Sequence, residues 1–223
     1  MRRPEGVRTI AGSGPAVPVG RDRHRELVVV GVLMAAVDTT IVVLALPAME
    51  RSLHIALSAV VWVIVAYILV VTILATQVGR LGDIFGRTRM YELGFLIFIL
   101  GSALCATATS ETTIIVFRIV EVVGGAFLTA NSCALLADAY PRDESGKAFG
   151  YNSIGWNAGA IHGILLGGFI ITYASWRWIF WINVPTGLAA LGLALKVLHD
   201  RAPHVRQRLD LVGMTFLGPG RAR

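Results

Sequence analysis

Long apolar stretches dominate this chain, and they do not alternate residue by residue with polar positions. Each stretch is close to the roughly 20 residues that a helix needs to cross the hydrocarbon core of a bilayer. The pattern predicts six transmembrane spans, at 26–48, 57–78, 91–109, 112–136, 147–172 and 178–198. A seventh apolar stretch begins near Leu209 and is interrupted at Gly218. We therefore expect an all-α membrane protein with a six-helix bundle and a truncated seventh helix.

Three regions follow from this pattern. Residues 1–25 are polar and Arg-rich and contain Pro and Gly, which predicts a disordered cytoplasmic tail. The apolar stretch after this tail is too long for the core of a cleaved signal peptide. Residues 26–199 form the six-span membrane bundle, and 200–223 form a cytoplasmic linker with the truncated start of span seven.

The composition excludes a water-soluble domain. Hydrophobic residues make up 55% of the 223 residues and charged residues only 15%, against roughly 25% charged in an average soluble domain. The loops are too short for a catalytic domain, and no nucleophile–base pair, metal cluster or phosphate loop is evident. We expect no enzyme activity and no cofactor. Cys105 and Cys133 lie within apolar stretches and are interpreted as packing residues.

The basic residues predict the orientation. The chain carries a net charge of +6, but its Lys and Arg cluster at the ends of the apolar stretches rather than on a surface for nucleic acid. Fifteen of them fall on the side of the N-terminus, and only Arg51 and Arg177 fall between spans on the opposite side. This asymmetry predicts a multi-pass protein of the cell (plasma) membrane with a cytoplasmic N-terminus and an even number of crossings.

Three charged residues lie inside predicted spans. At 1.5 Å per residue, Asp38 is about 16 Å from the inner face, and Arg118 and Glu121 are about 10 and 15 Å from the outer face. A charge at the centre of a spanning helix costs at least ~2.5–3.5 kcal/mol, so these side chains are expected to face the bundle interior and one another. Arg118 and Glu121 also share a helix face, because they are three residues apart. We refer to the three as the embedded charge cluster.

Two functions are open for the embedded charge cluster. When fully ionised it sums to a net charge of −1, and a surplus carboxylate in a low-dielectric medium is a candidate carrier of a proton. Alternatively, the cluster is a static salt bridge that joins the first and fourth spans. Glu121→Gln distinguishes the two, because only a proton carrier would lose transport.

Glycines recur every four residues in the fifth span. This glycine ridge, Gly155, Gly159, Gly163 and Gly167 followed by Gly168, predicts close approach of a neighbouring helix. The ridge either lets the neighbouring helix move along the fifth span or only packs the two helices densely without motion. His162 lies beside the ridge and is interpreted as a hydrogen-bonded packing residue.

The 79–91 loop is short, cationic and rich in glycine, which predicts a tight turn between two spans. Arg87 is expected to pair with an acidic residue on another helix, and Asp138 is our candidate.

This loop resembles the signature G-x-L-x-D-x-x-G-R of the major facilitator superfamily, in Gly79, Leu81, Asp83, Gly86 and Arg87. Residues 38–42 and 45–47 resemble the first-span motif of its fourteen-helix drug/proton antiporter branch. Residues 176–180 and 183–185 resemble the signature of that branch near span six.

The resemblance implies a fold of two six-helix bundles, of which this chain would supply the N-terminal one, that rock around a central substrate site. It further implies that the 79–87 motif is a cytoplasmic latch loop, that Arg118 is associated with proton coupling, and that the glycine ridge is the antiporter motif. The sequence departs from the family where Glu121 replaces Gln in R-x-x-Q-G and where Ile164 replaces Pro after Gly163.

Three hypotheses follow. The chain is the N-terminal half of a proton-coupled exporter of amphipathic or cationic small molecules and lacks its C-terminal bundle. It is a six-span protein that pairs with a second copy to form a transporter. It is a membrane interaction subunit that does not transport. In each case the partner is the lipid bilayer, and no nucleic acid is expected.

Overall fold

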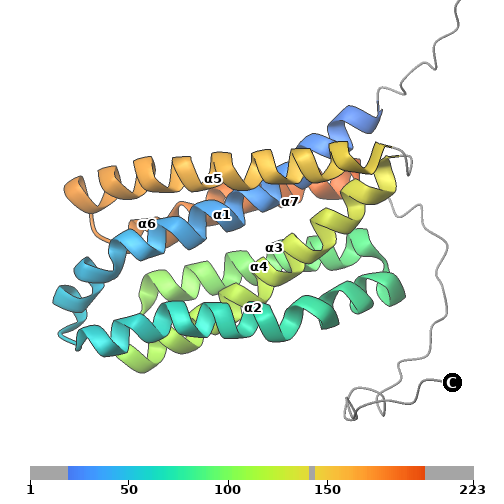
Figure 1. Cartoon of the computed structure of the whole chain (residues 1–223). Coiled ribbons are helices and arrows are strands. Elements are labelled where there is room, and N and C mark those ends of the chain that lie inside the picture. Colours follow the sequence, from blue (N-terminus) through green and yellow to red (C-terminus); the bar gives the residue numbers. More distant parts are fainter. Residues whose placement is uncertain (1–19, 141–143, 199–223) are drawn as a thin grey trace, which may run out of the picture.

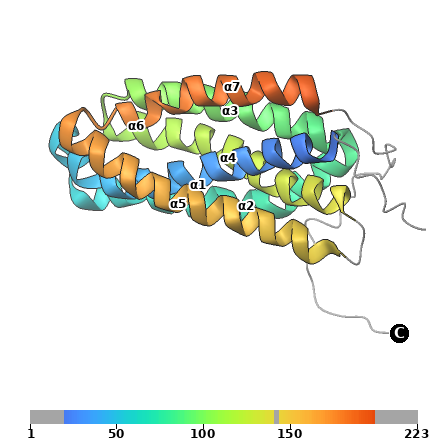
Figure 2. The same cartoon turned by 90° about the horizontal axis from the view of Figure 1, so that it is seen from above.

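The computed structural model describes residues 20–140 and 144–198, and this part of the chain is helical throughout, without a strand. Long helices run side by side along a common direction (Figures 1 and 2). In chain order the helices are α1 (Gly20–Leu53), α2 (Leu57–Phe85), α3 (Arg87–Thr107), α4 (Glu111–Ala139), α5 (Ser145–Tyr173), α6 (Trp178–Trp181) and α7 (Asn183–Val197). The prediction of an all-α membrane protein is confirmed.

Five helical segments are long and apolar enough to cross a bilayer, at 26–53, 87–107, 111–138, 149–173 and 178–197. The last of these combines α6 and α7. A sixth span is present if α2 is counted as one crossing, because α2 is bent by 50° between its Val61–Leu74 and Gln77–Phe85 parts. The predicted six spans therefore correspond to five regular crossings and one bent one.

Two predicted boundaries were wrong. Helix α1 begins at Gly20, inside the tail that was predicted to be disordered, and the rest of that tail (1–19) lies outside the described residues. Helix α2 continues to Phe85, so most of the expected 79–91 turn is helical. Gly86 alone makes the turn, with a φ of 98° that glycine adopts without a steric penalty. The linker and seventh span expected at 200–223 also lie outside the described residues.

Turns gather at the two ends of the bundle. The connections that follow α1, α3 and α5 (54–56, 108–110 and 174–177) lie at one end, which we call the far end. The start of α1, the turn between α2 and α3 and the end of α7 lie at the other end (Figure 1). Helices α1 and α4 run through the middle of the bundle (Figure 2). Charged residues on these two helices are therefore brought into the interior.

The glycine ridge packs α5 against α1. A Cβ at Gly159 would lie 2.6 Å from the Leu33 carbonyl oxygen, and one at Gly163 would lie 2.8 Å from the Val37 carbonyl oxygen. Gly155 and Gly167 meet α1 in the same way. Gly168 does not belong to this contact, because a Cβ there would meet nothing within 4 Å. One further residue along a helix turns the side-chain direction by about 100°, which takes Gly168 off the packed face.

A second glycine contact, which the sequence analysis missed, joins α3 to α4. A Cβ at Gly101 would lie 2.4 Å from the Glu121 backbone, and one at Gly124 would lie 2.3 Å from the Phe98 nitrogen. Small residues at such contacts let two backbones approach closely. The contact places the α3 backbone directly against the part of α4 that carries Glu121.

Candidate functional site

The embedded charge cluster assembles at the centre of the bundle. The Arg118 guanidinium of α4 bonds to both carboxylate oxygens of Asp38 on α1, with Nη1 donating to Oδ1 at 2.9 Å and Nη2 lying 2.8 Å from Oδ2. Both residues are 1% exposed. Arg118 thus contacts both oxygens of Asp38, one through a charge-assisted hydrogen bond and the other through an ion-pair contact.

Glu121 shares the same guanidinium but is held less completely. Arg118 Nη1 donates to Glu121 Oε2 at 2.7 Å, while the buried Oε1 atom has no hydrogen-bond partner among the described residues. The Ser102 hydroxyl and the Cys105 thiol, both from α3, lie beside this carboxyl group. Glu121 is 0% exposed, so a bare acceptor atom at this position is energetically costly.

A hydrogen-bonded chain extends the cluster to α3 and α7. Asn183 Nδ2 donates to Asp38 Oδ1 at 3.3 Å and to Ser102 Oγ at 3.1 Å. Ser102 Oγ in turn donates to the Phe180 carbonyl oxygen at 3.0 Å. Pro185 follows Asn183 in the first turn of α7, where its missing N–H leaves no helical hydrogen bond unmade.

Two aromatic rings face the guanidinium. The Arg118 Cζ atom lies 5.4 Å from the centre of the Tyr67 ring of α2 and 5.8 Å from that of Phe180 on α6. Both distances fit a cation–π contact. Thr39 Oγ1 donates to the Tyr67 hydroxyl at 2.7 Å, which ties α2 to α1 next to the cluster.

The electrostatics of this site follow from counting its charges. One guanidinium faces two carboxylates, so the fully ionised cluster carries a net charge of −1 on residues that are each at most 1% exposed. Protonation of one carboxyl would neutralise it. The geometry makes the two carboxyls unequal, because Arg118 contacts both oxygens of Asp38 but only one oxygen of Glu121.

The predicted contact of Asp38, Arg118 and Glu121 with one another is present. The participation of Tyr67, Ser102 and Asn183 was not predicted. A polar residue inside an apolar span was the available signal for each of them. That signal does not say which helix a side chain will meet, and many such residues bond only to their own helix. His162, for example, lies with Nδ1 2.7 Å from the Ala158 carbonyl oxygen of α5 and is exposed.

At the end of the bundle that carries Gly20, the latch loop forms an ion-pair triad. Arg87 bonds to Asp83 one turn earlier, with Nε and Nη2 at 3.0 and 2.8 Å from Oδ1. It also reaches α4, where Nη1 donates to Asp138 Oδ2 at 2.5 Å and to the Ala134 carbonyl oxygen at 3.3 Å. The expected contact between Arg87 and Asp138 is therefore present. These side chains are partly exposed, at 28% for Arg87 and 52% for Asp138.

The remaining residues of the latch loop differ in their surroundings. A Cβ at Gly79 would meet nothing within 4 Å, whereas one at Gly82 would run into the Asn131 side chain. Leu81 is half-buried. Asn131 is 1% exposed, and its Oδ1 atom has no hydrogen-bond partner among the described residues. Gly82 thus makes room for α4, while Gly79 faces open space.

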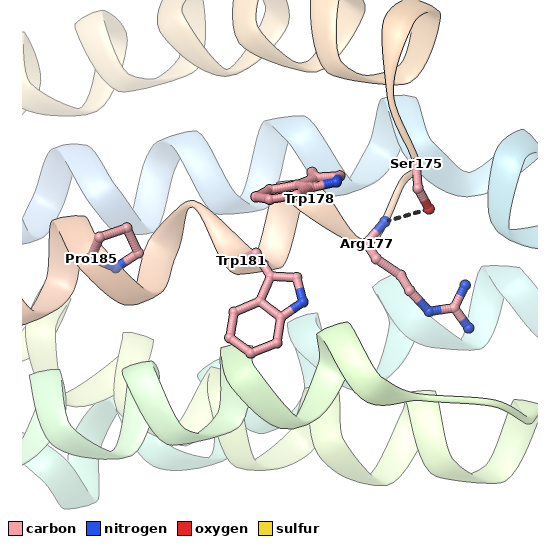
Figure 3. Close-up of a pocket in the computed structure, with 5 residues that line it drawn as sticks. All are labelled: Ser175, Arg177, Trp178, Trp181 and Pro185. Carbon is pink, nitrogen blue, oxygen red and sulfur yellow. Dashed lines mark hydrogen bonds between the residues drawn. The ribbon is translucent and has the colours of Figure 1, made fainter.

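A groove of about 470 Å³ lies along α6 and the start of α7, next to the far-end connection at 174–177 (Figure 3). It is lined by Ser175, Arg177, Trp178, Trp181 and Pro185. The two cysteines are free thiols, with Cys105 buried and Cys133 half-buried.

Comparison with known proteins places these features in a family context. Residues 28–213 match the family model described as Major Facilitator Superfamily. The chain is 37% identical over 172 residues to the riboflavin transporter RibZ of Clostridioides difficile, covering 77% of this chain and 38% of that protein. It is 35% identical over 191 residues to the tetracenomycin C resistance and export protein of Streptomyces glaucescens, covering 85% and 36%. The chain thus spans well under half the length of these curated relatives.

Solved structures of similar fold include two transporters. The proton:xylose symporter XylE superposes with a TM-score of 0.72 at 15% identity, over 81% of this chain and 45% of that one. A bacterial homologue of the lysosomal transporter Spinster superposes with a TM-score of 0.67 at 17% identity, over 90% and 47%. At these identities the likeness concerns the fold.

Proposed function

This chain belongs to the Major Facilitator Superfamily, and from that premise we propose that it is the N-terminal six-helix half of a proton-coupled exporter. Its substrates would be amphipathic or cationic small molecules. We place it in the plasma membrane with Gly20 on the cytoplasmic side, as the distribution of Lys and Arg favours. It would be a transporter and not an enzyme.

One observation carries the proton-coupled part of the proposal. The embedded charge cluster holds two carboxylates against one guanidinium, and Glu121 Oε1 is buried without a partner. A proton on that oxygen would remove the surplus charge and supply a donor toward the Ser102 or Cys105 side. We therefore assign the exchangeable proton to Glu121, while Asp38 stays ionised on Arg118.

A purely structural cluster would need a different number of carboxylates. A cluster that serves only to hold α1 and α4 together gains from every bond made and needs no surplus carboxylate. In this chain the Arg118–Asp38 pair alone would join these helices through one hydrogen bond and a second ion-pair contact. Glu121 adds one bond and one uncompensated charge, which favours a role in charge movement over a purely structural one.

The substrate part of the proposal is supported by the relatives. One of them is named as an export protein for tetracenomycin C and another as a multidrug resistance protein B homologue of Mycobacterium tuberculosis, at 34% identity. The riboflavin transporter makes vitamin transport a second candidate. A dye-efflux panel that includes riboflavin separates the two.

A second bundle is required by this proposal, because a central substrate site needs two halves. It would be supplied by a C-terminal bundle or by a second copy of the chain. The purified chain in liposomes is expected to show no proton-driven dye efflux as a monomer. Efflux from a homodimer would favour the second copy. A stable complex with another membrane protein, without efflux, would favour an interaction subunit and contradict the exporter.

Infrared spectroscopy tests the assignment of the proton. The carbonyl stretch of a protonated carboxyl group should disappear from the spectrum of the reconstituted chain in Glu121→Gln. The matched control is Glu111→Gln, which removes an exposed carboxyl from the same helix and should leave that signal intact. If the signal persists in Glu121→Gln and is lost in Asp38→Asn, the proton belongs to Asp38. If no such signal is found over the accessible pH range, the cluster is static.

A further inference from the structure

The groove at the far end has a polar side and an apolar side. The indole rings of Trp178 and Trp181 flank it, and both indole nitrogens lie toward the side of Ser175 and Arg177 (Figure 3). The six-membered rings lie toward Pro185 (Figure 3). Trp178 is 58% exposed and Trp181 is 41% exposed, so the described part of the protein leaves both rings largely uncovered.

Arg177 gives the polar side a positive charge. Its Nη2 atom donates to the Ala108 carbonyl oxygen at 2.7 Å, and its guanidinium stacks over the Trp176 ring at 4.5 Å. These contacts fix the side chain without neutralising it, and Arg177 forms no ion pair within residues 20–140 and 144–198. Its Nε and Nη1 donors are left for an anionic group.

The groove also lies at a defined depth. Trp178 is the first residue of the 178–197 segment, which is long and apolar enough to cross a bilayer. The first residue of a crossing segment lies near the boundary between headgroups and hydrocarbon. Tryptophan is enriched at this boundary because its ring is apolar and its N–H is polar. From Trp181 and Pro185 the same helix face continues to Leu188 and Leu195, which are 54% and 60% exposed.

We propose that this groove binds an anionic phospholipid of the surrounding bilayer. The phosphate group would accept hydrogen bonds from Arg177, and one acyl chain would lie along Trp181, Pro185 and Leu188. Charge complementarity selects this occupant, because a zwitterionic lipid brings its own cation to the phosphate. A lipid fits the groove better than free phosphate does, because the polar side of the groove matches a headgroup and the apolar side matches an acyl chain.

The test uses quenching of tryptophan fluorescence by lipids with brominated acyl chains. The full chain, carrying Trp62→Phe and Trp156→Phe, retains only the three tryptophans at the far end. It is reconstituted in vesicles of equal parts phosphatidylglycerol and phosphatidylcholine, with bromine on one lipid or the other. Brominated phosphatidylglycerol should be enriched about fivefold at the groove, the size expected for one basic side chain near an anionic headgroup.

Arg177→Gln should bring the two lipids to equal quenching, and Arg177→Lys should keep most of the preference because the charge remains. The matched control is Arg51→Gln, since Arg51 is also an exposed far-end arginine that donates to a backbone carbonyl, that of Pro47 at 3.1 Å. This control should leave the preference unchanged.

Equal quenching by both lipids in the parent chain, or a preference that survives Arg177→Gln, would overturn the proposal and leave only the ordinary lipid annulus. If Arg51→Gln abolishes the preference for phosphatidylglycerol as fully as Arg177→Gln does, the preference comes from the total charge of the far end and not from the groove. Should Arg177→Gln fail to fold, mass spectrometry of the unmodified chain decides: a retained anionic lipid supports the site, and its absence contradicts it. None of these readouts requires transport, so their outcome is independent of the proposed exporter.

Discussion

Arg118 holds Asp38 through two parallel contacts of 2.9 and 2.8 Å, and both side chains are buried at the centre of the bundle. The same guanidinium offers Glu121 a single contact. The two carboxyls of the cluster are therefore not equivalent, and substitutions at the three positions should differ in their cost.

Arg118→Met should be the most destabilising change in the cluster. It leaves two buried carboxylates without a cation, and breaking a buried ion pair typically costs about 3–5 kcal/mol. The expected result is a large fall in the unfolding temperature of the purified chain in detergent. Arg118→Lys is the matched variant, because it keeps the charge but cannot form the two-point contact. The unfolding temperature of Arg118→Lys should lie between those of the parent chain and Arg118→Met. Equal unfolding temperatures for all three proteins would contradict this account.

Glu121→Gln should cost less stability than Asp38→Asn. The first change removes the surplus charge and keeps the Arg118–Asp38 pair, whereas the second removes the charge that pairs with Arg118 and places an amide NH2 opposite one of its donors. We expect Asp38→Asn to cost about 1.5–3 kcal/mol, the usual value for a hydrogen bond to a charged group, and Glu121→Gln to be close to neutral. Thermal denaturation of both variants at the same pH makes the comparison. The reverse order would show that Glu121 carries the structural bond.

Gly159→Ala should separate α5 from α1. The added methyl would lie 2.6 Å from a backbone oxygen and 2.7 Å from the Ala36 Cβ atom, and overpacking of this kind costs about 1–3 kcal/mol. Gly168→Ala is the internal control, because its methyl meets open space. That control should be neutral or slightly stabilising. A double-cysteine distance measurement between α1 and α5 would report the displacement directly.

Gly86→Ala should weaken the turn between α2 and α3. Its φ of 98° is outside the range that alanine adopts readily, and such backbone strain costs about 1–3 kcal/mol. Gly79→Ala, inside α2 and facing open space, should be neutral or slightly stabilising, because alanine favours a helix over glycine. Limited proteolysis of the two variants compares the opening of the turn. Equal cleavage rates would indicate that Gly86 is not a constraint.

The spans could be predicted from the sequence because hydropathy depends only on residue order. The shared depth of Asp38, Arg118 and Glu121 could be predicted as well, since the rise of a helix is constant. Which helices meet is a different matter. Ser102 and Asn183 joined the cluster only because α3 and α7 pack beside α1 and α4, and no spacing along the chain encodes that neighbourhood.

The errors have equally specific causes. The 79–91 segment was expected to be a turn because glycine permits tight turns. Gly79 and Gly82 nevertheless lie inside α2, and the chain turns only at Gly86. Gly168 was added to the ridge because it follows Gly167 in sequence. On a helix, adjacent residues point in different directions, so a repeat of four predicts the ridge and a neighbour does not.

The hydrogen-bonded cluster takes side chains from α1, α3, α4 and α7, with rings from α2 and α6, while α5 contributes none of the contacts described for it. Helix α5 packs on α1 through the glycine ridge, at Gly155, Gly159, Gly163 and Gly167. Among the contacts of the described residues, lengthwise movement of α5 along α1 would therefore disturb glycine packing and leave the ion pairs and hydrogen bonds of the central cluster in place.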